Sequence, residues 1–169
     1  RKQAEEILRE RSHLSLLEAE VGKALGQGGT IPTILNRCAK AMDQYLQVAG
    51  VSIWTINNQT NQLERQAGAG IVTLKAPTPQ LLNHELSQVS QQIIQVSHQT
   101  LEVPLVVEGR LMGMMAICSS NPLSPQVQDV LGWIANAIAV GIDRVKAREE
   151  LQSRREALLF RLASQIRNS

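Results

Sequence analysis

Histidine offers the widest choice of catalytic and metal-binding chemistry, and this chain has three of them. They are His13, His84 and His98. Two metal ligands on one helix need a separation of three or four residues, and no two of these histidines meet that spacing. We therefore expect each to be a solvated side chain, and we expect no metal site.

The two cysteines, Cys38 and Cys118, lie within apolar helix and strand patterns. Burial in such elements raises the pKa of a thiol and removes the reactive thiolate, so both should be inert and unpaired. No glycine-rich phosphate loop, nucleophile elbow or pair of carboxylates beside a base is present either. The sequence predicts no catalytic residues and no enzyme activity in this chain.

Composition excludes several other classes of function. The chain has 169 residues, a formal charge of +2 and only four aromatic residues, too little for a basic, base-stacking surface. No apolar run reaches eighteen residues, and no leader precedes a cleavage site. We expect a cytoplasmic protein that binds no nucleic acid and makes no membrane contact through this part.

Charge divides the chain into three parts. Residues 1–25 and 143–169 carry 21 of the 32 charged residues. We interpret 1–25 as an N-terminal signalling helix, 26–142 as a globular core, and 143–169 as an exit helix that leads toward a further domain.

The stretch Thr100–Cys118 organises the core. Two apolar runs flank Glu108-Gly109-Arg110, which predicts a β-hairpin with a glycine-containing turn. Both runs are apolar at nearly every position rather than at alternate ones. We therefore expect the hairpin to lie centrally in a sheet that is covered on both faces.

The remaining elements follow from caps and periodicity. Thr30 should cap a helix that ends near Gln47, and Ser124 should cap a long helix with Pro125 at its first position. Strands are expected over 48–56 and from residue 63. Between 69 and 99 we expect a helix of about three turns, while 92–97 fits either a strand or a helix.

This order of elements resembles a GAF domain, above all those of bacterial sensor kinases and phytochrome-like receptors. The most specific residues are Val103-Pro104-Leu105, Gly109, Gly113 and Asn121-Pro122-Leu123-Ser124, and the resemblance covers about residues 14–148. It implies an α+β fold, with a central antiparallel sheet of about five strands flanked by helices and long helices entering and leaving. His84-Glu85-Leu86 also resembles the start of a kinase phosphoacceptor motif, but Ser87-Gln88 departs from its continuation.

The resemblance implies a sensory, relay and dimerisation module of a two-component signalling protein. Ligand-binding relatives have a longer segment where this chain has only 69–99, bilin-binding relatives carry a cysteine there, and cyclic-nucleotide relatives carry an Asn-Lys-Phe-Asp-Glu pattern. This sequence has none of these, so no cofactor is expected. The alternative is a sensor of a bilin, a cyclic nucleotide or another small molecule that regulates an output kinase or cyclase.

Apolar residues recur at spacings of three, four and seven on both terminal helices. On residues 1–25 this pattern fits equally well a helix docked on its own domain and a helix paired with a second copy. An isolated domain would leave this stripe in water, so we expect a parallel homodimer besides contacts with neighbouring domains of the same chain. The expected dimer interface consists of Leu14, Leu17, Val21, Leu25, Ile138, Ile142 and Val145.

Overall fold

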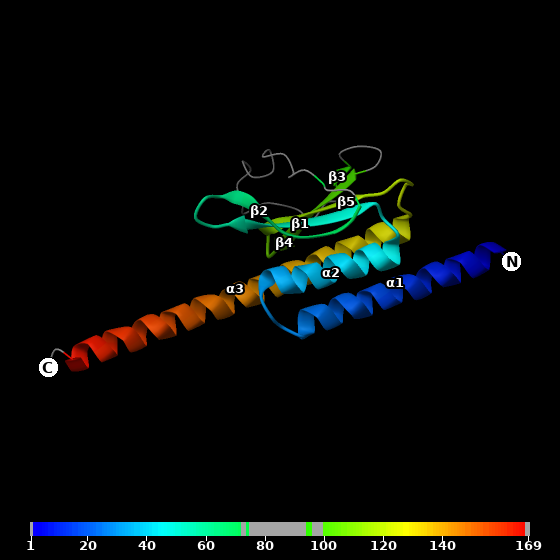
Figure 1. Ribbon diagram of the computed structural model, residues 1–169. Helices are drawn as coiled ribbons and strands as arrows, with labels where there is room; N and C mark the ends of the chain where they lie inside the picture. Colours follow the sequence, from blue (N-terminus) through cyan, green and yellow to red (C-terminus); the bar gives the residue numbers. More distant parts are fainter. Residues whose placement is uncertain (1, 72–73, 75–93, 96–99, 168–169) are drawn as a thin grey trace.

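A five-stranded antiparallel sheet lies above a layer of helices in the computed structural model, which describes residues 2–71, 74, 94–95 and 100–167 (Figure 1). The order along the sheet is β2-β1-β5-β4-β3. The strands are β1 (Gly50–Asn57), β2 (Gln62–Gly70), β3 (Ile94–Gln95), β4 (Thr100–Val107) and β5 (Arg110–Cys118).

The hairpin of β4 and β5 has the predicted turn. Glu108 and Gly109 both have positive φ, at 50° and 77°, as a two-residue turn that matches the twist of antiparallel strands requires. β5 also pairs with β1, so it is the central strand of the sheet. Both strands bury residues on both faces, which confirms the expectation drawn from their unbroken apolar pattern.

Two helices cover one face of the sheet, α2 (Ile31–Leu46) and α3 (Pro125–Arg167), and α1 (Lys2–Gly26) packs against both of them on the side away from the sheet (Figure 1). The predicted caps are present, because the Thr30 and Ser124 hydroxyls accept hydrogen bonds from the Thr33 and Val127 amides. In Figure 1, α1 and α3 run in the same direction and the termini lie at opposite ends of the molecule. The exit helix is therefore the continuation of α3, with no break near residue 143.

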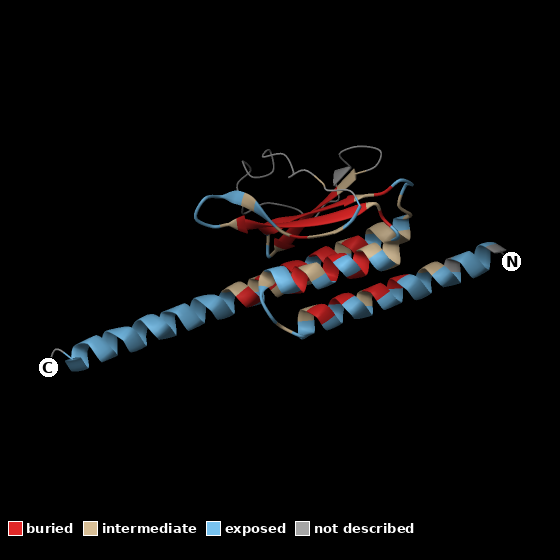
Figure 2. Cartoon of the chain, in the orientation of Figure 1, coloured by how far each residue is buried: buried red, intermediate tan, exposed pale blue. Residues whose placement is uncertain are grey.

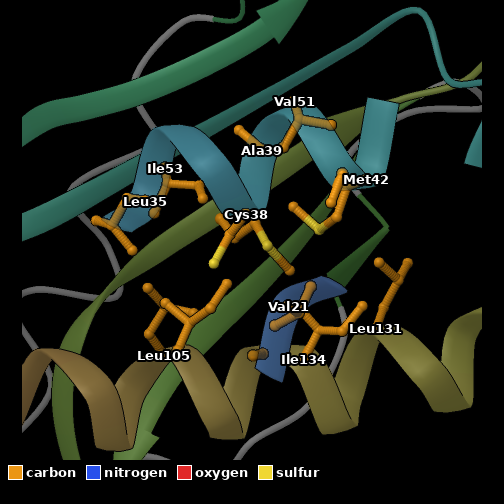
Figure 3. Packing of buried hydrophobic residues seen from close by; sticks show 14 of the residues in the cluster. Val21, Leu35, Cys38, Ala39, Met42, Val51, Ile53, Leu105, Leu131 and Ile134 are labelled. Carbon is orange, nitrogen blue, oxygen red and sulfur yellow. The ribbon is translucent and has the colours of Figure 1, made fainter. Parts of the chain in front are cut away.

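The main core lies between this face and the helices (Figures 2 and 3). Leu35 and Cys38 from α2, Ile53 from β1, Leu105 from β4 and Ile134 from α3 are all at most 1% exposed. Alternation along each strand sends every second side chain into this core and the others to the opposite face.

The predicted helix between residues 69 and 99 lies outside the described residues, as do His84 and His98. Of the stretch whose conformation the sequence left open, Ile94–Gln95 forms the short strand β3 on the edge of the sheet, paired with β4.

Candidate functional site

The seven residues expected at a dimer interface belong to the core of a single chain. Six of them are buried, at 0–9% exposure, and Leu25 packs against the same core at its edge. The expectation that an isolated domain leaves this stripe in water is therefore wrong, because α1, α2, α3 and the sheet cover it together. Association of two chains stays a prediction, and it needs other surface residues.

The structure describes three of the candidate reactive residues, Cys38, Cys118 and His13, and it places none of them in a catalytic or metal-binding cluster of described residues. Burial raises the pKa of the Cys38 thiol to about 12, which keeps it protonated and inert, as expected. The His13 ring lies edge-on to Tyr45, with centroids 6.4 Å apart. Among the described residues no group of three or more His, Cys, Asp or Glu side chains could hold a metal ion. Nor is any described helix apolar over the length that a bilayer crossing requires.

The second face of the sheet carries its own apolar cluster. The largest side chains there are Trp54 and Met114, at 2% and 1% exposure. Since α2 and α3 cover the opposite face of the sheet, this cluster is separate from the main core. The other members are Ile56, Val106, Leu111 and Ala116, with Leu63 and Leu74 at the edge.

Polar groups cross this apolar face in one row. Ser52 pairs with Ala116, and Ala116 pairs with Glu102, so the three side chains lie side by side on β1, β5 and β4. The Ser52 hydroxyl is buried, with no hydrogen-bond partner in the described structure. Glu102 is only 8% exposed. A buried hydroxyl without a partner costs about 1–3 kcal/mol, so this row is the best candidate for contact with a polar ligand.

The strand register extends the row with a cation. Gly68 lies opposite Ser52, and the guanidinium of Arg65 occupies the space where a side chain on Gly68 would stand. The face therefore presents a guanidinium, a hydroxyl and a carboxyl group along one line. The sequence analysis did not identify Arg65, Ser52 and Glu102 as a group. The signal that could have indicated them was a serine and a glutamate within otherwise apolar strands.

Glu102 should make stability depend on pH. Burial raises the pKa of its carboxyl group. The stability that protonation gives is fully present below the unfolded-state pKa of about 4.3 and is lost as the pH rises through the folded-state value. We expect Glu102→Gln to raise the free energy of unfolding at pH 7 and to flatten its fall with pH.

Urea melts at several values between about pH 4 and pH 7 measure this effect. Glu20→Gln is the matched control, since Glu20 is exposed on α1 and its substitution should leave the melts unchanged. A Glu102→Gln variant that is less stable than the parent at pH 7 would contradict a carboxyl group whose pKa is raised by burial.

Two contacts fix α1 alongside α3. Near the start of α3, the Ser124 hydroxyl that caps this helix also donates a hydrogen bond to the Glu10 carboxylate of α1. Farther along, Gly141 lies so close to Leu25 that a Cβ on the glycine would come within 2.7 Å of the leucine Cδ2. The helices are thus held in register at both ends of their contact.

Two polar contacts tie the sheet to α3 near the point where this helix leaves the core. The Lys146 ammonium donates a hydrogen bond of 3.1 Å to the carbonyl oxygen of Ile56, at the end of β1. Burial lowers the pKa of Lys146, while Glu149, Asp143 and Glu64 act in the opposite direction. Arg110, beside the hairpin turn, lies 3.5 Å from Asp143. The side chain of Ile56 belongs to the second-face cluster, so the hydrogen bond from Lys146 to the Ile56 carbonyl oxygen connects that face with α3.

The sheet order and the helices on one face define an α+β domain, and comparison with solved structures assigns its fold. A GAF domain attributed to a sensor histidine kinase from Pseudomonas syringae pv. tomato matches with a TM-score of 0.64 and 14% identity, over 88% of this chain and 99% of that chain. The GAF domain of a phosphoenolpyruvate-protein phosphotransferase from Coxiella burnetii matches with a TM-score of 0.62 and 13% identity, over 85% and 98%.

A phycoerythrobilin-bound GAF domain of a cyanobacterial phytochrome matches with a TM-score of 0.57 and 12% identity, over 84% of this chain and 98% of that chain. No protein-family model and no curated protein matches the sequence. The chain has the GAF-domain fold, and the fold expected from the hairpin and its flanking helices is confirmed.

Proposed function

We propose that this chain is a sensory relay module of a cytoplasmic signal-transduction protein, with a two-component sensor kinase as the leading candidate for the parent. The carrying observation is the pair of parallel helices. α1 approaches from one end of the molecule, and α3 continues beyond the core at the other (Figure 1). The solved domains that share the fold include one attributed to a sensor histidine kinase and one from a phytochrome, which supports a signalling role.

The contacts already described supply the physical path for such a relay. A displacement of α1 acts on the cap of α3 through Glu10 and Ser124, and on its middle through Leu25 and Gly141. Close packing makes such a helix pair move between discrete arrangements rather than deform continuously. The proposal gives this chain no catalytic activity and no resident cofactor.

The relay is tested by weakening one contact on α1. Glu10→Ala removes the hydrogen bond to Ser124, which is worth about 1 kcal/mol, or roughly a fivefold change in a local opening equilibrium. We expect faster amide hydrogen exchange not only near residue 10 but also along α3 from residue 127 to about 138. Mass spectrometry of the peptides resolves the two regions.

Glu6→Ala is the matched control, because Glu6 is an exposed glutamate of the same helix that takes part in none of these contacts. It should leave exchange along α3 unchanged. An effect of Glu10→Ala that is confined to α1 would contradict the relay.

A second candidate function is that of a small-molecule sensor, and the polar row on the second face favours it. The Ser52 hydroxyl, which has no hydrogen-bond partner among the described residues, and the carboxyl group of Glu102 would orient a ligand, while Trp54 and Met114 would contact its apolar part. Lys146 would then report occupancy of this face to α3 through the Ile56 carbonyl. Colour or added mass in the protein purified from cells would favour this function over a ligand-free relay.

A further inference from the structure

A groove opens where the three helices meet, and we call it the junction groove. The end of α2 and the start of α3 lie beside the first half of α1 there (Figure 1). No strand of the sheet contributes a lining residue, so this groove is distinct from the second-face cluster. Its volume is about 270 Å³, and the side chains that it brings together include those of Arg9, Glu10, Leu14, Tyr45, Leu46 and Val127.

The size and the floor of the groove describe the body of a ligand. Pockets for drug-sized molecules begin at about 300 Å³, so the junction groove suits a smaller, metabolite-sized molecule. Leu14 is 6% exposed, and the partly buried Leu46 and Val127 pack against the same core. The groove therefore offers a short apolar body a floor that the core already holds in place.

Two opposite charges line the groove from neighbouring positions of α1. Arg9 is exposed and forms no ion pair or hydrogen bond with another described residue. The Ser124 hydroxyl binds one carboxylate oxygen of Glu10, which leaves the second oxygen for another donor. A guanidinium group binds a carboxylate through two parallel hydrogen bonds, and a carboxylate oxygen accepts from an ammonium group. The two side chains thus match two different charged groups.

The end of α2 also favours a cation in the groove. The C-terminus of a helix carries a partial negative charge, because its last carbonyl groups have no partner within the helix. The last turn of α2 contains no basic residue, and the uncharged Gln47, which ends the helix, lines the groove. A cation alone would still be opposed by Arg9, and an anion alone would be opposed by Glu10 and by this helix end.

We propose that the junction groove binds a small zwitterion, which carries an ammonium and a carboxylate group on a short apolar body, as free amino acids do. The carboxylate group pairs with the Arg9 guanidinium. The ammonium group pairs with Glu10 and the end of α2, and the apolar body packs on Leu14 and Val127.

The proposal rests on the proposed relay function, because the ligand occupies the contact that the relay uses. Glu10 lines the groove and is also the partner of the α3 cap. A ligand held by α1, α2 and α3 together favours the arrangement in which these helices are in contact. At ten times its Kd, it favours that arrangement about elevenfold over one that does not bind. Amide hydrogen exchange near residues 9–14 and in the first turns of α3 should therefore slow.

Binding is measured on the full chain with named probes. Each of the standard amino acids is screened at about 5 mM by thermal melting, and those that raise the melting temperature are titrated by calorimetry. We expect a Kd between about 10 μM and 1 mM for at least one amino acid with an apolar side chain. The corresponding amine without the carboxylate and the corresponding acid without the ammonium should each bind at least tenfold more weakly.

Two variants locate the site, and each has a matched control. Arg9→Gln removes the guanidinium group, while Glu10→Gln removes a charge and keeps an oxygen that can accept from Ser124. Each should raise the Kd at least tenfold. Arg11→Gln and Glu6→Gln change exposed residues of the same helix outside the groove, so they should leave the Kd unchanged.

The proposal is overturned if no amino acid binds, or if an analogue with one charge binds as tightly as the zwitterion. Binding that Arg9→Gln and Glu10→Gln leave unchanged would place the ligand on another surface and would also overturn it. The unfolding transition of each variant is the folding control. Hydrogen exchange in Glu10→Ala without ligand reports on the relay separately. Transmission to α3 in a chain that binds no amino acid refutes only the site, and binding without transmission refutes only the relay.

Discussion

Leu105→Ala is expected to lower the free energy of unfolding by about 2–5 kcal/mol. Leu105 is 0% exposed in β4, and Figure 3 shows it between Leu35 and Cys38 of α2 and the helix α3. The substitution loses the transfer free energy of the deleted groups and leaves a cavity, because three surrounding elements limit how far the site can collapse. Urea melts give this loss directly.

Leu16→Ala provides the comparison. Leu16 is 52% exposed on α1, so its truncation should change stability by no more than about 0.5 kcal/mol. A loss below about 1 kcal/mol at Leu105 would place that side chain outside the core and would contradict the position of β4.

Gly113→Ala is expected to destabilise the sheet by about 3 kcal/mol or more. A Cβ on Gly113 would overlap the carbonyl oxygen of Trp54 and lie 3.1 Å from the Cα of Thr55. Both obstacles are backbone atoms of the neighbouring strand β1, so no side-chain rotation relieves the overlap. β1 and β5 would have to separate where they pair at the centre of the sheet.

The control exchanges the same residue types where space is open. Nothing lies within 4 Å of a Cβ built on Gly22, and Gly22 is inside α1. Gly22→Ala should therefore stabilise the chain by about 0.5–1 kcal/mol through helix propensity. Thermal melts of the two variants should move in opposite directions, and a Gly113→Ala variant as stable as the parent would contradict the close approach of β1 to β5.

Local chemistry explains why the elements could be predicted from the sequence. Thr30 and Ser124 cap their helices by hydrogen bonds within three residues, and Glu108-Gly109 closes a turn between adjacent strands. Such signals require no knowledge of distant contacts.

The sequence could not show in the same way which element or which chain packs against each apolar helix face. Spacings of three and four residues show that Leu17 and Ile142 share an apolar face with their neighbours, but a face that packs on its own domain has the same pattern as one that packs on a second chain. Only the tertiary structure, in which both residues are buried within one chain, separates these cases.

The candidate site required the strand register. Ser52 and Glu102 are fifty residues apart, and they become neighbours only because both pair with Ala116 on β5. The bulge between Ile53 and Trp54 then decides which residues of β2 lie beside Ser52 on β1. Neither the pairing nor the bulge can be read from composition or periodicity.

Because α3 is unbroken, the length of its exposed part sets both a distance and a rotation angle between the core and whatever follows the helix. One residue inserted between Arg148 and Leu151 would advance everything after it by about 1.5 Å and turn it by about 100° about the helix axis. Seven inserted residues would nearly restore the orientation, at a total rotation about 20° short of two full turns. The number of residues in this helix therefore sets the angle about the helix axis at which any group joined beyond Arg167 is held relative to the sheet.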